Sequence, residues 1–167
     1  MKILKNKKGF TLVELLAVIV VLAIVMSLAV VAITGVLDNA RKATFVADAK
    51  AFLEGARNLV TSDEMNSLLD GDSGEYAVAC DSSTIPSSRT IDVSTIKTQQ
   101  GGVKSPYGNN YDKGNSKIYV SAAKDGTDCK YTYKIYLTDG VYAIGGPSED
   151  NAIEWNVLST SNVVTAQ

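Results

Sequence analysis

An apolar run of membrane length near the N-terminus constrains this chain more than any other feature. The 23 residues from Leu15 to Leu37 carry no charge, and as an α-helix they would extend about 34 Å, slightly more than the ~30 Å hydrocarbon core of a bilayer. Four lysines precede the run within the first eight residues, which predicts a cytoplasmic N-terminus and a C-terminal part outside. Glu14 stands at the mouth of the run, where a carboxylate is costly and therefore suggests a function.

Length and hydropathy alone allow two interpretations of this segment. A secretory signal peptide would have the same basic start and small residues near Ser27–Ala29, but its apolar run is usually only about 7–15 residues. A single-pass membrane anchor fits the length better. Neither interpretation explains the position of Glu14.

The residues around Glu14 suggest a third interpretation. The stretch Lys7-Lys8-Gly9-Phe10-Thr11-Leu12-Val13-Glu14-Leu15-Leu16 closely resembles the class III signal of type IV prepilins and pseudopilins. The resemblance implies that a prepilin peptidase cuts between Gly9 and Phe10 and methylates the new amine of Phe10, while the apolar segment stays on the mature protein. It also implies that Glu14 forms an assembly salt bridge with the N-terminal amine of a neighbouring subunit.

Elementary electrostatics supports a paired Glu14. Cleavage would leave a cationic amine on Phe10, and opposite charges attract strongly in a low-dielectric environment. An unpaired carboxylate there would be costly, and pairing offsets much of that penalty. The alternative is a Glu14 that lies near enough to the lipid headgroups to stay solvated without a partner.

The helical pattern continues beyond the apolar run. Apolar residues recur at three- and four-residue steps with charged residues between them, which is typical of a helix with one buried face. We expect one helix from about Phe10 to the low sixties, with a further turn or two ending near Asp70-Gly71. Where many pilins of this family have a helix-breaking glycine and proline, this chain has Ala23 and Val31, so we expect a continuous helix. The predicted apolar face consists of Ala40, Phe45, Ala49, Phe52, Leu53, Ala56, Leu59 and Val60.

After Gly71 the composition changes to residues typical of strands and turns. Strand-like alternation marks residues 117–123, 130–137 and 141–145, and the Asp-Gly pairs between them are hairpin signals. Short strands are also predicted at residues 75–80 and 90–93. The predicted fold class is therefore α+β, a long N-terminal helix with a hydrophobic first half, packed on a small antiparallel sheet. The expected divisions are a leader peptide at 1–9, a transmembrane or filament-core helix at 10–37, its amphipathic continuation at 38–69 and a sheet domain at 70–167.

Cys80 and Cys129 are the two cysteines of the chain, and both lie in the part expected outside the cytoplasm. An even number of cysteines in an oxidising compartment favours a disulfide. The resemblance implies the same, because proteins of this family often have a disulfide in the C-terminal domain. Two unpaired cysteines are the alternative.

Two further motifs are weaker. Residues 70–75 offer three carboxylates separated by glycines, and calcium favours flexible oxygen-rich loops of this kind. The stretch falls short of a full EF-hand loop, and acidic glycine-rich turns are common at helix ends, so we expect no metal. Residues 105–111 resemble the loop of proline, aromatic residue, glycine and tyrosine in major pseudopilins, with Tyr107 at the aromatic position, but they also form an ordinary turn sequence.

Composition argues against an enzyme and against nucleic-acid binding. The chain has no histidine, no nucleophile with an obvious base and no glycine-rich phosphate loop, so we expect neither catalysis nor a cofactor. It has 16 Lys and Arg against 18 Asp and Glu, and 12 against 18 once residues 1–9 are removed. A general basic face for nucleic acid is therefore not expected.

The predicted function is structural, that of a pilin in a type IV pilus-like filament. By resemblance, the precursor waits in the cytoplasmic (inner) membrane, is processed by prepilin peptidase, is extracted by the pilus assembly machinery and joins other copies of itself in an extracellular filament. One alternative is a pseudopilin of a type II secretion or DNA-uptake machine. Another, from a different class, is a single-pass membrane-anchored extracellular binding domain that never polymerises.

Overall fold

A computed structural model describes residues 11–70, 74–80, 87–98 and 104–166. Helix α1 runs without a break from Leu12 to Asp70, which confirms the predicted continuous helix and its end. The chain divides into two compact units, residues 1–39 and 40–167. The first part of α1 belongs to one unit, and the second part of α1 belongs to the other.

One antiparallel sheet lies in the described part of the second unit. Its strands follow the order β1-β2-β3-β4-β6, and β5 pairs with β3 next to β4. The predicted strands in residues 90–93, 117–123, 130–137 and 141–145 are confirmed as β1 to β4. The C-terminal stretch, for which the sequence predicts no structure, forms β5 and β6 with two short 3-10 helices between them. The elements are β1 (Ser88–Asp92), η1 (Val93–Thr95), β2 (Lys117–Asp125), β3 (Asp128–Thr138), β4 (Tyr142–Ile144), β5 (Ile153–Glu154), η2 (Trp155–Val157), η3 (Thr160–Asn162) and β6 (Val163–Thr165).

The prediction of a strand at residues 75–80 is wrong. Residues 74–80 form turns and irregular backbone, yet Ala77 and Val78 are completely buried. The side chain of Arg89 donates a hydrogen bond to the Ala77 carbonyl at 3.5 Å. The apolar residues of this segment therefore reflect packing on the core and not membership of the sheet.

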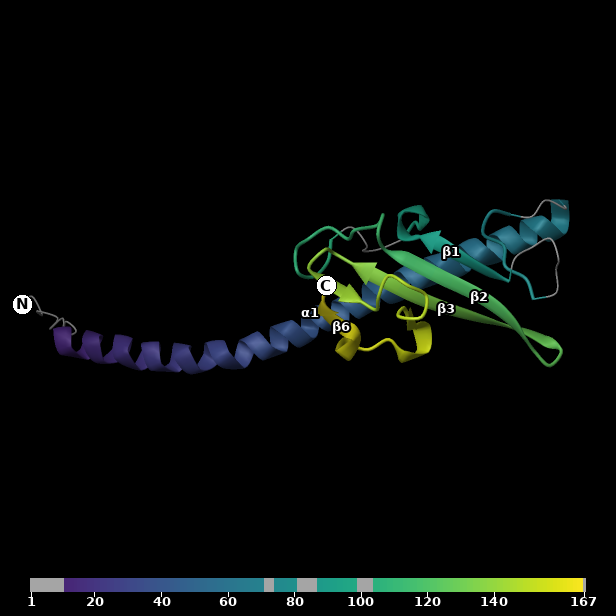
Figure 1. Cartoon of the computed structure of the whole chain (residues 1–167). Helices are drawn as coiled ribbons and strands as arrows, with labels where there is room; N and C mark the ends of the chain where they lie inside the picture. Colours follow the sequence, from purple (N-terminus) through teal and green to yellow (C-terminus); the bar gives the residue numbers. More distant parts are fainter. Residues whose placement is uncertain (1–10, 71–73, 81–86, 99–103, 167) are drawn as a thin grey trace, which may run out of the picture. The chain divides into compact units, whose positions relative to one another are not determined.

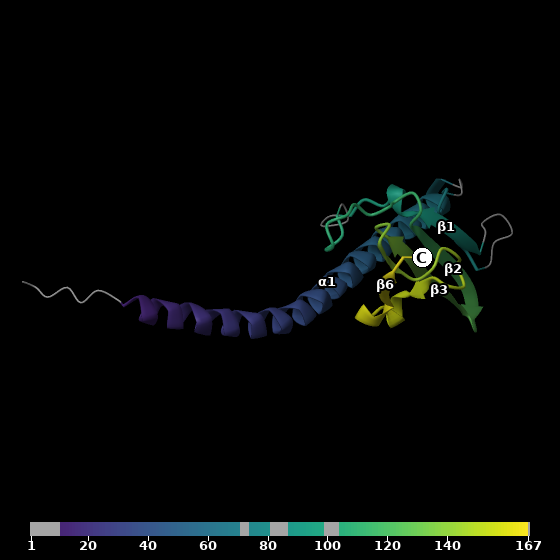
Figure 2. The same ribbon diagram turned by 60° about the vertical axis from the view of Figure 1, so that its left-hand side comes forward.

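Within the second unit, α1 packs against one face of the sheet (Figure 1). Figure 2 shows the same layering from a second direction. Buried helix residues recur every three or four positions, and alternate strand residues face them, as expected for a helix on an antiparallel sheet. The predicted apolar face is confirmed except that Ala40 is exposed and Leu59 only partly buried. Ala40 is exposed because the buried part of α1 begins only at Phe45. The centre of the core contains Phe45, Phe52, Leu53, Ala56 and Val60 from α1 with Ile91, Ile118, Val120, Ile135, Leu137 and Ile144 from the sheet.

Gly55 allows the chain after β1 to lie close to α1. A Cβ atom at this position would be 2.3 Å from Cγ2 of Ile96, and Ile96 is only 5% exposed. Isoleucine is branched at Cβ and restricted about χ1, so a buried Ile96 cannot easily move aside. The missing side chain of Gly55 is therefore what permits residues 93–98 to cover the helix.

We expect Gly55→Ala to lower the free energy of unfolding by up to about 2 kcal/mol, because an overpacking cost of about 1–3 kcal/mol outweighs a helix-propensity gain of ~1 kcal/mol. In an Ile96→Ala background the same substitution should instead stabilise the protein, since the crowded methyl group is gone. Denaturant unfolding of the wild type, both single variants and the double variant measures this change of sign. Stabilisation by Gly55→Ala in the wild-type background would contradict the close contact.

Candidate functional site

Thr11 and Glu14 cap the start of α1, at the site predicted from the sequence. The backbone N–H and the hydroxyl of Thr11 donate to Oε2 of Glu14 at 2.9 and 3.0 Å, and the backbone N–H of Glu14 donates to Oγ1 of Thr11 at 3.3 Å. This reciprocal pair is a capping box, which satisfies amide groups that the first helical turn leaves without partners. Gly9 and Phe10, the predicted cleavage and methylation residues, lie outside the described residues.

The capping box leaves acceptor capacity on Glu14. Both hydrogen bonds from Thr11 end on Oε2, and none of the described residues donates to Oε1. An ionised carboxylate can accept about four hydrogen bonds, so Glu14 can bind an amine while it caps its own helix. The role of Thr11 was missed by the sequence interpretation, although Thr-x-x-Glu before an apolar run is the signature of a capping box.

The first part of α1 has no buried face. Each described large apolar side chain from Leu12 to Leu37 is at least 47% exposed. Among the described residues, α1 is the one helix long and apolar enough to cross a membrane, and none of its most apolar window is buried. Apolar surface on every side of a helix requires lipid or other apolar helices around it.

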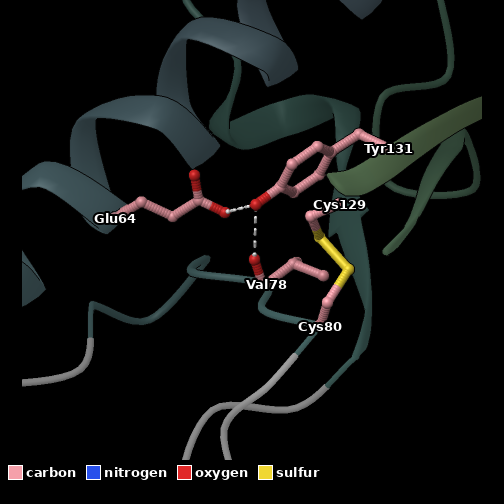
Figure 3. Close-up of a disulfide and its surroundings, with 5 residues drawn as sticks. All are labelled: Glu64, Val78, Cys80, Cys129 and Tyr131. Carbon is pink, nitrogen blue, oxygen red and sulfur yellow. Dashed lines mark hydrogen bonds between the residues drawn. A yellow bond between two sulfur atoms is a disulfide. The ribbon is translucent and has the colours of Figure 1, made fainter. Parts of the chain in front are cut away.

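A disulfide and a tyrosine hydroxyl join three segments at the end of α1 (Figure 3). Cys80 and Cys129 form the predicted disulfide, with Cα atoms 5.9 Å apart. The hydroxyl of Tyr131 donates to Oε1 of Glu64 at 2.8 Å and lies 3.3 Å from the carbonyl oxygen of Val78. Burial, followed by the interaction with Glu64, raises the pKa of Tyr131 to about 12, so the hydroxyl keeps its proton at physiological pH. The helix, residues 74–80 and the β2–β3 hairpin are thereby tied together.

Residues 105–111, the loop that resembles that of major pseudopilins, pack onto the core. Tyr107 stacks on Tyr142 of β4 with ring centroids 3.7 Å apart. Tyr111 meets Phe45 of α1 edge-on, with centroids 5.2 Å apart. Aromatic pairs in these geometries stabilise a core beyond the area that they bury. The aromatic residues of the loop therefore have a structural role whatever its resemblance implies.

Tyr111 also holds a partly buried carboxylate. Its hydroxyl donates to Oδ2 of Asp48 at 2.7 Å, and Tyr111 itself is only 5% exposed. Burial raises the pKa of Asp48, and the hydrogen bond from Tyr111 opposes that rise in part. The charged form of Asp48 is therefore tolerated at a cost to the folded state.

We expect Asp48→Asn to stabilise the protein at neutral pH, because asparagine keeps an oxygen acceptor for Tyr111 without a charge to desolvate. Since the folded-state pKa of Asp48 is raised, its contribution to stability is present below the ordinary value of 3.8 and is lost as the pH rises through the folded-state pKa. The advantage of the variant should therefore shrink as the pH falls through this window. Thermal unfolding from neutral to acidic pH measures it, and an advantage that is constant with pH would contradict the desolvated carboxylate.

Residues 71–73, the centre of the acidic stretch considered for calcium, lie outside the described part of the chain. Among the residues that are described, no group of three or more acidic or cysteine side chains could hold a metal ion. Asp63, close to this stretch, accepts a hydrogen bond from the backbone N–H of Tyr76 at 2.9 Å. This carboxylate therefore anchors the chain that follows α1.

Comparison with known proteins bears on the N-terminal segment. Residues 4–30 match the family described as prokaryotic N-terminal methylation motif. Comparisons with curated proteins and with solved structures found no match. The matched residues include Gly9, Phe10, the Thr11–Glu14 capping box and most of the apolar run. The chain thus carries the class III prepilin signal that is typical of type IV pilins and pseudopilins, at the head of a pilin-like α+β fold.

Proposed function

We propose that this protein is a structural subunit of a type IV pilus-like filament. The observation that carries the proposal is a prepilin signal joined to a helix whose first part is exposed and apolar on every side. Lipid can cover that surface before assembly, and the same segments of other copies can cover it afterwards. From Phe45 to Val60, α1 needs no such cover, because its apolar face is already buried within the second unit.

Glu14 is the proposed assembly residue. In this proposal a prepilin peptidase cuts between Gly9 and Phe10 and methylates the amine of Phe10, and the Glu14 carboxylate pairs with the amine of a neighbouring subunit. The capping box supports this role, because it holds the carboxylate at the start of the helix with Oε1 still able to accept. A charge pair in a low-dielectric core would fix the axial register of adjacent helices.

The proposed route runs from the membrane to the cell surface. The precursor would span the cytoplasmic membrane with its N-terminal lysines inside, and the pilus assembly machinery would then extract it into the filament. The Cys80–Cys129 disulfide accords with a sheet domain outside the cytoplasm.

Intact mass of the protein extracted from membranes tests the processing. We expect the loss of residues 1–9 and the gain of one methyl group on Phe10. Gly9→Leu is the matched control, because a bulky residue at the cleavage position should leave the chain at full length. An unprocessed wild-type chain would favour the single-pass anchored binding domain.

Imaging of cells with an antibody against the sheet domain tests the filament itself. We expect labelled filaments that extend from the cell surface. A processed and methylated chain without surface filaments would overturn the pilus-like role and favour a pseudopilin.

A further inference from the structure

An open pocket lies in the second unit beside Trp155, the single tryptophan of the chain. Its volume is about 460 Å³, within the range of roughly 300–1,000 Å³ that is typical of small-molecule sites. Helix α1 lines one side, β3 lines another, and the turn from β5 into η2 completes it. The pocket is separate from the N-terminal signal and is not used by the proposed assembly.

Aromatic side chains form the apolar part of the pocket. Tyr131 and Tyr133 come from β3, and Trp155 comes from η2. Tyrosine and tryptophan combine a flat apolar face with a polar edge, and they usually bind a partner with both parts. A ligand that matches them needs a compact apolar face bordered by hydrogen-bonding groups.

The charged side chains of the pocket balance one another. Arg57 and Lys130 are cationic, and Glu64 and Glu154 are anionic. A strongly charged ligand of either sign would meet like charges at short range. A neutral ligand with hydroxyl groups suits the set better, because it can donate to the carboxylates and accept from the cations in charge-assisted hydrogen bonds.

Most of these charged groups are available to a ligand. Glu64 accepts the hydrogen bond from Tyr131. By contrast, Arg57, Lys130 and Glu154 form no side-chain hydrogen bond or ion pair with any other residue that the structure describes. The pocket therefore combines aromatic faces with three charged side chains that hold no other described residue, while Glu64 and the Tyr131 hydroxyl already bind each other.

We propose that this pocket binds a neutral saccharide. One sugar ring would lie with its C–H face against the aromatic side chains, and its hydroxyl groups would hydrogen-bond to the carboxylates and cations around them. All the lining residues belong to the second unit, so binding does not depend on filament assembly.

The fluorescence of Trp155 tests the proposal, because no other tryptophan contributes to it. The full-length protein, in a detergent without a sugar headgroup, is titrated with glucose, galactose, mannose and N-acetylglucosamine. We expect a saturable change in emission with at least one of these sugars and none with inorganic phosphate. Absence of a saturable change with all four sugars, or saturation by phosphate alone, overturns the proposal.

Matched substitutions test whether the sugar binds in this pocket. Glu154→Gln should weaken it about tenfold, because a charge-assisted hydrogen bond becomes a weaker neutral one. Glu149→Gln makes the same chemical change at an exposed residue that does not line the pocket, and it should leave the affinity unchanged. Arg57→Gln, from α1, is a second test variant that should also weaken binding, and circular dichroism checks that each variant is folded. Unchanged affinity in both pocket variants, or equal weakening in the Glu149 control, overturns the proposed site.

Discussion

Replacing Glu14 with alanine should reduce surface filaments to background while the protein still inserts into the membrane. In the proposed filament, the variant leaves the N-terminal amine of each neighbour unpaired in a low-dielectric core, and an unpaired buried charge is strongly destabilising. Insertion should persist, because the apolar run itself is unchanged. Membrane fractionation and filament yield measure the two steps separately. Normal filament yield from Glu14→Ala would contradict the assembly role.

Glu14→Gln separates the charge of this residue from its function as a helix cap. Glutamine at the same position can still complete a capping box with Thr11, whereas alanine cannot. We expect the glutamine variant to fail in assembly as the alanine variant does, because it retains the cap but lacks the charge. If Glu14→Gln assembles normally and Glu14→Ala does not, the essential role is capping, and the proposed salt bridge is wrong.

Replacing both Cys80 and Cys129 with alanine should produce the largest loss of stability among these variants. The disulfide joins residues 49 apart, and closing a loop of this size contributes about 4 kcal/mol when the effect is counted as lost entropy of the unfolded chain. Denaturant unfolding of the oxidised wild type and the double variant measures the difference. A difference below about 1 kcal/mol would contradict this contribution.

Tyr131→Phe separates the contribution of the hydrogen bonds beside the disulfide from that of the disulfide itself. It removes the hydroxyl that contacts Glu64 and Val78 but keeps the ring and both cysteines. We expect it to cost about 1 kcal/mol, the usual net value of one hydrogen bond. In the absence of the disulfide this cost should fall, because residues 74–80 are then less firmly held beside the hairpin. An identical cost in both backgrounds would show that the hydrogen bonds and the disulfide act independently.

The two parts of α1 present different physical problems, and this difference underlies the proposed function. Around Phe52 the helix has one apolar stripe, which the sheet and the loops of the same unit bury. Around Ile19 it is apolar on all sides and the side chain is 57% exposed. The apolar surface around Phe52 is therefore buried within the subunit, whereas the surface around Ile19 requires lipid or further copies of the same helix to cover it.

The sequence by itself determined the features that depend on near neighbours along the chain. Three- and four-residue periodicity predicted α1 as far as Asp70, and alternation with Asp-Gly turns predicted β2, β3 and β4. The prepilin signal is likewise a local pattern, and residues 4–30 match its family. With two cysteines in the chain, the disulfide had one possible intrachain pairing.

Only the tertiary structure decided which distant residues meet. It placed Tyr131 against Glu64, although 67 residues separate them, and it brought Ile96 over Gly55. It also left residues 74–80 outside the sheet despite their apolar character, and it assembled the pocket at Trp155 from α1, β3 and η2. Periodicity reports which side of an element is apolar, but the partner of that side depends on how all the elements pack together.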